Sequence, residues 1–418
     1  MTIATAFKVL TDCFRVDADV PRRVPVLSVN NDNSRSVLFE GRYYSPLVDT
    51  IMDDLARRSV ESFSVSRIAS RIRGDRSHAV VYAPDGSFAR ALVEKHCRRL
   101  LRPRASAYSP MEEYVWERIL RSSGARKVVG IQPSRELCAA ARRLGVWVSD
   151  LQHGVIAHGH PWYDEASRGN EPAEWLPNAF LVWDESSADV TRRWVKKLGV
   201  RTWVIGHPWL SRFRANAPDD VVVRAQSAKY QGHLPPRDRE ANILVSLSWG
   251  EVDIPNGFLA APLLEAIQKS SDRFNWMIRL HPNQMRGFAS NEGETFPVFH
   301  ARELSSRVEW RMASEAPLPV VLAATDLHVS WTSSVTIEAA LMGVRTALLN
   351  PKLLPGGMYS NYFTEQREAG FVDVLPASSR EILDWIGRNR DVRHAPASTL
   401  EAEQAYRELI DFLAEPRS

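Results

Sequence analysis

Short apolar runs alternate with helical patterns along nearly the whole chain, and this alternation constrains the fold more than any other feature. The strand-like runs are 23–29, 78–84, 126–133, 146–152, 242–250, 275–282 and 326–334. Helical patterns lie between them. In 45–58, for example, Leu47, Ile51 and Leu55 fall four residues apart and so share one helical face. Strands that alternate with helices of this length predict parallel βαβ units.

The same alternation of strand-like and helical segments occurs in both halves of the 418-residue chain, which is long enough for two domains. A polar stretch with prolines and no clear strand separates the halves. We therefore predict a Rossmann-like domain at 1–213, a linker at 214–241, a second Rossmann-like domain at 242–395 and a terminal helix at 396–418. That helix could pack on either domain. The predicted fold is α/β, with two Rossmann-like domains that face each other across a cleft.

Composition narrows the class of protein. Hydrophobic residues make up 44% and charged residues 25%, which is typical of globular proteins, and a net charge of +3 argues against a nucleic-acid partner. The three cysteines are far apart and form no CxxC pair, which fits a reducing cytoplasm. No apolar run reaches the length of a membrane span, and the N-terminus is a poor signal peptide. We expect a cytoplasmic protein.

Charge is unevenly distributed in the first half. The stretch 61–104 holds ten Lys and Arg against four Asp and Glu. One interpretation is a set of solvated helix faces. The other is a surface that meets anionic lipid or a phosphate-bearing partner, which would place the protein peripherally at the inner face of a membrane.

Polar and small residues follow the strands of the second half, where ligands of open parallel sheets bind. The motif "SWTSSVTIEAALMG" puts Thr332, Ser333 and Ser334 at a strand-to-helix junction, which suits a phosphate. Glu338 follows one turn later and could accept hydrogen bonds from ribose hydroxyls. The alternative is an ordinary Ser/Thr helix cap.

Two neighbouring strand ends add further candidates. "RLHP" supplies Arg279 and His281 as donors for phosphate oxygens, and Pro282 ends the strand. "SLSWGE" supplies Gly250, where a backbone could approach a ligand closely. Each is weak alone, because a loop histidine with ordinary partners is more common than a ligand-binding one.

The stretch "SDLQHGVIAHGHPWY" in the first half has three histidines within eight positions. This stretch has three possible interpretations: a zinc site, a plain loop or a loop that carries a catalytic base. Glycines and a proline leave no rigid frame for a metal, so we expect none. We favour His153 as a general base that takes the proton of a substrate hydroxyl, the acceptor. His158, His160 and Asp164 would then shape the pocket that holds this acceptor.

Taken together, these motifs resemble the GT-B class of nucleotide-sugar glycosyltransferases and the related UDP-GlcNAc 2-epimerases. "VSWTSSVTIEAALMGV" resembles the donor-binding helix of that class, and "VIGHPWL" resembles its Gly-Asn-Pro crossover with His207 in place of Asn, for which we favour a structural role. "RLHP" with "TSS" is similar to motifs of bacterial GT-B sialyltransferases and of CDP-glycerol glycerophosphotransferases. "LQHG" resembles the His-Gly element of the latter, where the histidine is the base. The similarity spans about residues 126–375.

The resemblance implies an enzyme that transfers a sugar from a nucleotide-sugar to a hydroxyl of a glycan or lipid-linked acceptor, in surface polysaccharide (capsule or O-antigen of lipopolysaccharide) biosynthesis. It would be inverting and metal-independent, with the nucleotide-sugar as substrate and no other cofactor. Sialyltransferases use an acidic pair followed by glycine for their catalytic base, and this element is missing here. Its absence favours His153 as the base. The alternatives are a 2-epimerase and a non-catalytic sugar-nucleotide-binding scaffold of a polysaccharide assembly complex.

Overall fold

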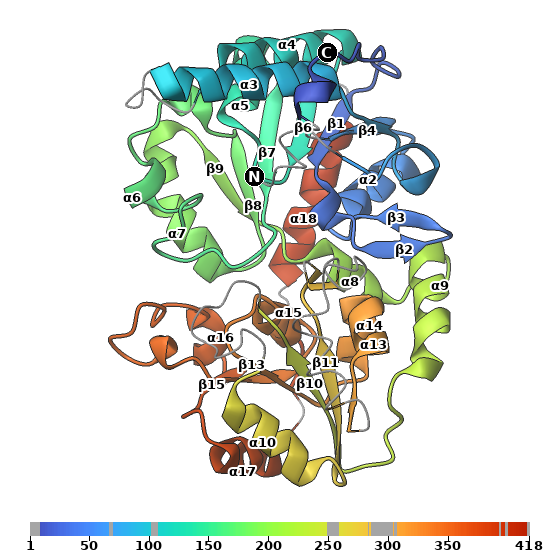
Figure 1. The fold of residues 1–418 in the computed structure, drawn as a ribbon, viewed down its shortest axis with the longest axis vertical. Coiled ribbons are helices and arrows are strands. Elements are labelled where there is room, and N and C mark those ends of the chain that lie inside the picture. The colour runs from blue at the N-terminus through green and yellow to red at the C-terminus, as the bar shows by residue number, and fades with distance from the viewer. Residues whose placement is uncertain are drawn as a thin grey trace. The chain divides into compact units, whose positions relative to one another are not determined.

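The structure is a computed structural model that describes residues 9–66, 70–101, 108–248, 259–282, 284–285, 304, 307–392, 394–397 and 400–415. The chain forms two compact units (Figure 1). The first comprises Met1–Pro208 together with Leu400–Ser418, and the second comprises Trp209–Thr399.

The first unit is built on a seven-stranded parallel sheet with the strand order β5-β4-β1-β6-β7-β8-β9. Its strands are β1 (Val26–Asn30), β4 (Ser62–Ser66), β5 (Val81–Tyr82), β6 (Lys127–Gly130), β7 (Trp147–Leu151), β8 (Ala179–Val182) and β9 (Arg201–Val204). A separate antiparallel hairpin is formed by β2 (Val37–Phe39) and β3 (Arg42–Tyr44). The predicted βαβ units are confirmed here, because every pairing in the large sheet is parallel.

Helices cover both faces of this sheet, because successive strand residues point to opposite sides. Val26 packs with α2 (Val48–Arg57) and α18 (Leu400–Ala414), whereas Leu27 packs with α3 (Asp85–Leu101), α4 (Pro110–Ser123) and α5 (Arg135–Arg143). Helices α6 (Glu165–Arg168) and α7 (Glu185–Val195) also belong to this unit. Ser134 caps α5 by accepting a hydrogen bond from Leu137 N.

The second unit repeats the design with a six-stranded parallel sheet in the order β12-β11-β10-β13-β14-β15. Its strands are β10 (Ala241–Ser246), β11 (Phe274–Arg279), β12 (Val308–Glu309), β13 (Leu327–Ser330), β14 (Arg345–Leu348) and β15 (Val372–Val374). Its described helices include α8 (Pro208–Ala215), α9 (Val221–Tyr230), α10 (Ala261–Ser270), α13 (Arg311–Glu315), α14 (Leu318–Ala323), α15 (Val335–Leu341), α16 (Thr364–Glu368) and α17 (Ser379–Asn389). Helices α10 and α17 share one core cluster with the sheet, while α13, α14 and α15 share another.

The observed units differ from the expected boundaries at the predicted linker. The stretch 214–241 contains α9, whose Tyr230 belongs to a buried cluster of the second unit. The terminal helix α18, for which either domain was possible, packs on the first unit, where Leu409 and Leu413 are buried against the sheet. Both placements have one cause: these helices bury apolar side chains on partners distant in sequence, and a local pattern does not reveal such partners.

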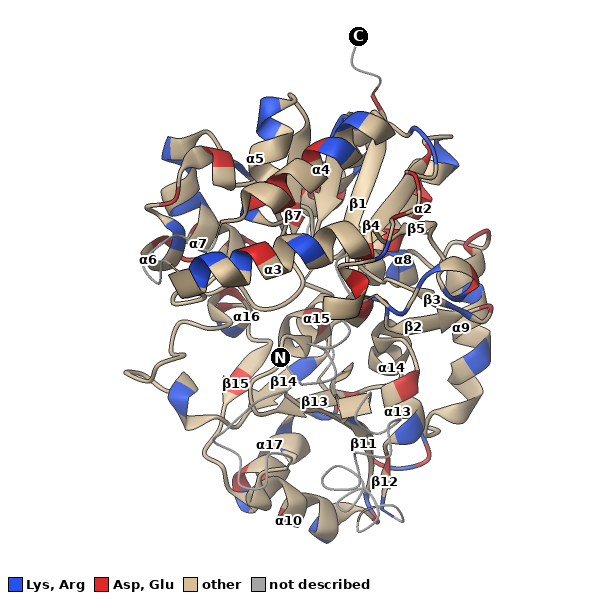
Figure 2. Ribbon diagram, turned by 45° about the horizontal axis from the view of Figure 1, so that its top comes forward, with Lys and Arg blue, Asp and Glu red and all other residues tan. Residues whose placement is uncertain are grey.

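Several basic residues of the stretch 61–104 form ion pairs with acidic residues of the first unit. Figure 2 shows both signs of charge along α3 and α4. Ion pairs involve Arg73, Arg90, Lys95 and Arg98, each with an acidic residue. This pairing is what solvated helix faces predict, and contact with a membrane surface stays a prediction. In the described part of the chain, no helix is both long enough and apolar enough to cross a membrane.

Candidate active site

The second sheet reverses its strand order between β10 and β13. From β10 the chain continues outward through β11 and β12, then returns to the other side of β10 and continues through β13, β14 and β15. Ligands of open parallel sheets bind outside the carboxyl ends of the strands at such a switch point. The residues that follow these two strands here are Ser248 and Thr332–Ser334, as the sequence pattern predicts.

Hydrogen bonds tie the strand ends at this switch point together. Ser248 Oγ donates to Thr332 O at 2.7 Å, and Asn350 Nδ2 donates to Thr332 Oγ1 at 2.8 Å. Asn350 follows β14 and is buried. The structure therefore brings Ser248, Thr332 and Asn350 together across three adjacent strands, and the Thr332 hydroxyl is already engaged in holding this edge.

The two serines that open α15 differ in their use. Ser333 Oγ accepts a hydrogen bond from Val335 N at 3.3 Å, which is a local turn contact. Ser334 occupies the N-cap position, but its backbone is helical and its side chain makes no capping bond. Among the described residues the Ser334 hydroxyl has no hydrogen-bond partner, although the residue is half-buried. Helix capping therefore does not account for a serine at position 334, and the Ser334 hydroxyl can bind a ligand.

Arg279 lies at the end of β11 and has a structural task. Its Nη1 donates to Ala313 O at 2.6 Å and to Ala316 O at 2.7 Å, at the end of α13. Burial lowers the pKa of the Arg279 guanidinium to about 10, an effect that the nearby Glu338 carboxylate opposes. Arg279 and Glu338 are therefore close enough for their charges to interact. One guanidinium nitrogen is committed to the helix end.

The other "RLHP" residues form a short turn. His281 N donates to Gln284 Oε1 at 2.7 Å, and Gln284 N donates back to His281 O at 2.8 Å. His281 is half-buried and Pro282 is exposed. Gly250 lies outside the described residues. A phosphate-binding role for His281 thus stays a prediction.

Beneath this edge the second sheet holds a buried neutral histidine. His328, within β13, has Nε2 at 2.7 Å from Ser246 Oγ and Nδ1 at 3.0 Å from Thr346 Oγ1. Burial lowers the pKa of His328 to about 3, so the ring is uncharged near neutral pH. Sequence reasoning passed over this residue, because a histidine inside an apolar strand pattern carries no local signal.

In the first unit, His153 follows β7 on a turn that the preceding residue holds. Gln152 is buried; its Oε1 accepts from Trp183 N at 2.7 Å, and its Nε2 donates to Gly154 O at 2.9 Å and to Ser187 Oγ at 3.1 Å. His153 itself is exposed at the carboxyl edge of the sheet. The buried amide therefore fixes the backbone from which the imidazole projects.

Tyr163 lies behind the His153 ring. Its hydroxyl is 3.4 Å from His153 Nδ1, and burial raises the pKa of this phenol well above its ordinary value. If Nδ1 carries the proton and donates it to the phenol oxygen, Nε2 presents a lone pair. That tautomer is the one a general base needs.

The other predicted acceptor residues hold their own loop. His160 Nδ1 accepts from Trp162 N at 3.1 Å, and burial lowers the pKa of the His160 ring. Asp164 Oδ2 accepts from Gly159 N at 2.7 Å, and its Oδ1 lies 3.7 Å from His158 Nδ1. These contacts are structural, and acceptor contact by the three side chains stays a prediction. No group of His, Cys, Asp and Glu side chains within the described ranges is arranged to hold a metal ion.

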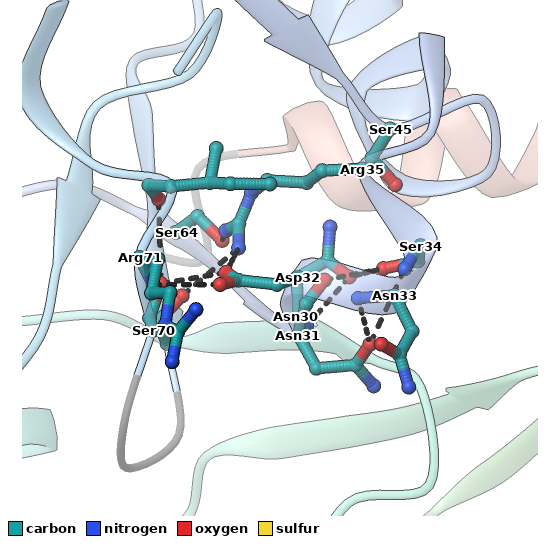
Figure 3. Close-up of polar contacts among 12 residues, drawn as sticks. Asn30, Asn31, Asp32, Asn33, Ser34, Arg35, Ser45, Ser64, Ser70 and Arg71 are labelled. Atoms are coloured by element: carbon teal, nitrogen blue, oxygen red, sulfur yellow. Dashed lines mark hydrogen bonds and ion pairs between the residues drawn. The ribbon is translucent and has the colours of Figure 1, made fainter. Parts of the chain in front are cut away.

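A second polar group at the same edge of the first sheet escaped sequence reasoning (Figure 3). We call it the β1 cluster; it comprises Asn30, Asn31, Asp32, Ser34, Arg35, Asp49, Ser64, Ser66 and Ser70. Arg35 is fully buried and donates to the hydroxyls of Ser64 and Ser66, both at 2.9 Å. The available signal was the polar run "NNDNSR" directly after a strand.

Carboxylates organise the β1 cluster around Arg35. Asp32 lies 3.5 Å from Arg35 Nη1 and accepts hydrogen bonds from Ser70 Oγ at 2.7 Å and from Arg71 N at 2.6 Å. Burial raises the pKa of Asp49 to about 6, although the Ser45 N–H and the charge of Arg35 act in the opposite direction. The first-sheet edge thus contains a polar network in which the buried guanidinium of Arg35 interacts with two carboxylates.

Comparison with known proteins supports the architecture. The sequence matches no known protein-family model and no curated protein. Among solved structures, the wall teichoic acid polymerase TagF is similar with a TM-score of 0.55 at 12% identity, over 99% of this chain and 93% of that chain. The UDP-GlcNAc 2-epimerase from Neisseria meningitidis is similar with a TM-score of 0.57 at 14% identity, over 93% of this chain and 99% of that chain. At such low identity the likeness shows the fold alone: this chain has the two-domain α/β fold of the GT-B type.

Proposed function

We propose that this protein is a glycosyltransferase that moves a sugar from a nucleotide-sugar donor to a hydroxyl of an acceptor glycan. The observation that carries the proposal is the hydroxyl-rich switch point of the second sheet. There Ser248 binds Thr332 O, and the half-buried hydroxyl of Ser334 has no partner among the described residues. Small hydroxyl residues at such a position leave room for a diphosphate and supply donors to its oxygens.

The donor would be held by the second unit. We assign the phosphate contacts to Ser333, Ser334 and His281. The N–H groups of Arg279 that are not bonded to the carbonyl oxygens of Ala313 and Ala316 would add to these contacts. Glu338 is assigned to the ribose hydroxyls, because a carboxylate accepts hydrogen bonds from hydroxyls but repels phosphate. Protein donors would neutralise the charge that develops on the leaving nucleotide.

His153 is assigned as the general base. The acceptor oxygen attacks the anomeric carbon, the bond from that carbon to the donor phosphate breaks, and the acceptor proton passes to His153 Nε2. Attack from the face opposite the leaving group inverts the anomeric configuration. The exposed position of His153 on a fixed turn, with Tyr163 beside Nδ1, supports this role.

The biological setting we propose is surface polysaccharide biosynthesis, with a glycan or lipid-linked acceptor at the cytoplasmic side of a membrane. The likeness to a wall teichoic acid polymerase supports this class of product. Capsule and O-antigen are the specific polymers that the sequence motifs favour.

A sugar-nucleotide 2-epimerase is the second candidate. The likeness to UDP-GlcNAc 2-epimerases favours it, and so does the β1 cluster, which places the carboxylate of Asp32 at the edge of the first sheet. An epimerase interconverts its sugar nucleotide without an acceptor, whereas a transferase releases nucleotide only when an acceptor is present.

One experiment separates these functions. The protein is incubated with CMP-, CDP-, UDP- and GDP-sugars, with and without a pool of acceptor glycans, and the products are followed by mass spectrometry and NMR. A thermal-shift screen with the four nucleotides first selects the base, because binding to the native state raises the melting temperature. Acceptor-dependent nucleotide release supports the transferase, and acceptor-independent isomerisation contradicts it. Nucleotide binding without turnover would indicate a scaffold.

A further inference from the structure

The first unit contains a cavity of about 440 Å³ beside α5, a volume typical of ligand pockets. The described residues that line it are Tyr108, Glu113, Ala139, Arg142, Arg143, Glu174 and Trp175. Helix α5 runs from the carboxyl end of β6 to the amino end of β7, so its second half lies away from the edge that bears His153. This cavity is therefore distinct from the proposed reaction site.

An aromatic platform forms part of the cavity wall. The rings of Tyr108 and Trp175 stack with their centres 4.9 Å apart and 13° between their planes. The guanidinium of Arg135 lies 5.9 Å from the centre of the Trp175 ring and is itself bound by Glu171. Both rings are half-buried, so they are positioned by their surroundings yet partly exposed.

The charged groups of the cavity balance one another. Arg143 forms an ion pair with Glu113. Arg142 and Glu174 are exposed, and within the described part of the chain neither side chain has a hydrogen-bond or ion-pair partner. Among the described lining residues, the cavity therefore presents one unpaired cationic side chain, one unpaired anionic side chain and no excess of either sign.

We propose that this cavity binds a neutral sugar ring of an oligosaccharide. The C–H face of a pyranose can lie against the exposed parts of the aromatic rings, where dispersion and the removal of apolar surface from water favour it. Its hydroxyls can accept hydrogen bonds from Arg142 and donate them to Glu174. The Tyr108 hydroxyl can do both, since burial raises its pKa to about 12 and keeps it protonated.

The balance of charge selects against an anionic ligand. A nucleotide or a phosphorylated sugar would gain from Arg142 but would meet the unpaired carboxylate of Glu174. The site goes beyond the proposed transfer reaction and does not require it. In a transferase it would hold a glycan chain at a distance from the hydroxyl that reacts.

The test uses the full-length protein on an array of neutral, phosphorylated and sialylated oligosaccharides. We expect binding to neutral glycans, and about tenfold weaker binding for the double variant Arg142→Gln with Glu174→Gln, which removes charge-assisted hydrogen bonds. Arg118→Gln is the matched control, because Arg118 is an exposed arginine on α4 that does not line the cavity. Both positions of the double variant are on the surface, and thermal unfolding checks that it keeps the native fold.

A fourth protein, His153→Ala, separates this site from the proposed active site. We expect it to bind neutral glycans as the wild type does, whether or not it transfers sugar. The proposal is overturned if no neutral glycan binds, if charged glycans are preferred, or if the double variant binds as tightly as the wild type. Loss of binding in His153→Ala alone would assign the glycan to the transfer site instead.

Discussion

At the carboxyl edge of the first sheet a polar network is built around charged groups, whereas beneath the same edge of the second sheet a buried row of polar groups is neutral. Arg35, Asp32 and Asp49 form an ionic network in the first. Ser246, His328 and Thr346 form a row of uncharged groups in the second. Two sheets of one architecture thus present different chemistry at equivalent places, so the fold alone does not fix what each edge binds.

The difference agrees with the proposed division of labour. A base in the first unit needs defined orientation, which buried amide and ionic contacts supply to the strand-end turns. A diphosphate carries its own charge, so the second edge needs room and hydrogen-bond donors more than fixed counter-charges.

The largest expected effect comes from removing the proposed base. His153→Ala should lower the rate of sugar transfer by about 10²–10⁴, which is the usual contribution of a general base. His158→Ala is the matched control on the same loop and should affect mainly the acceptor KM. Transfer by His153→Ala at close to the wild-type rate would place the base elsewhere, with Asp164 and Glu165 as the next candidates.

Breaking the ionic network should destabilise the first unit. Arg35→Met leaves the carboxylates of Asp32 and Asp49 without their buried counter-charge and should cost about 3–5 kcal/mol of the free energy of unfolding. Urea unfolding, followed alongside hydrogen exchange in β1 and β4, measures the change. Arg118→Met, at an exposed position, should cost little. Equal losses in the two variants would mean that the network contributes no special stability.

The uncharged row of Ser246, His328 and Thr346 predicts that the stabilising contribution of His328 is lost in acid. The folded-state pKa of His328 is about 3, well below its ordinary value of about 6.5, so the unfolded chain binds the extra proton between these limits. The stabilising contribution of His328 should therefore fall by about 1.4 kcal/mol for each pH unit below about 6. Relative to the wild type, His328→Asn should gain stability by about this amount per pH unit in urea unfolding measured from pH 7 to pH 4. Parallel slopes for the two proteins would contradict the burial of a neutral ring.

For Asp49 in the ionic network, the expected change of stability with pH has the opposite sign and covers a narrower pH range. The folded-state pKa of Asp49 is raised to about 6, so its contribution is present below its ordinary pKa and is lost as the pH rises towards 6. Relative to wild type, Asp49→Asn should gain stability as the pH rises, by up to about 3 kcal/mol between pH 4 and pH 7. The slopes of Asp49 and His328 largely cancel in the wild type, so single variants are needed. An unchanged difference across this range would indicate that Asp49 titrates normally.

Local patterns predicted much of the fold but little of the buried polar chemistry. The strand ends at Ser248 and Thr332 were predictable, because apolar runs stop there and helical patterns follow. The partners of Arg35 were not, because Ser64 and Ser66 are 29 and 31 residues away and become neighbours only when β4 pairs with β1. Placement of α18 on the first unit depends on contacts from the other end of the chain.

Some strand-end residues also proved to be more constrained than their patterns indicate. Arg279 was expected to bind phosphate, yet its Nη1 holds two carbonyl oxygens of the α13 region. His160 and Asp164 have loop-holding contacts. The type of a residue at a strand end indicates which interactions its side chain can make, but not whether neighbouring residues already occupy those interactions.

The central claim is that the second unit binds the donor and the first supplies the base, and one paired measurement tests it. Nucleotide affinity by calorimetry and transfer rate by product analysis are determined for His153→Ala and for the double variant Ser333→Ala with Ser334→Ala. The account predicts opposite patterns: His153→Ala keeps near wild-type nucleotide affinity and loses transfer, whereas the serine variant loses about 1–3 kcal/mol of nucleotide binding. Unchanged nucleotide affinity in a folded serine variant, or full transfer by His153→Ala, would contradict it.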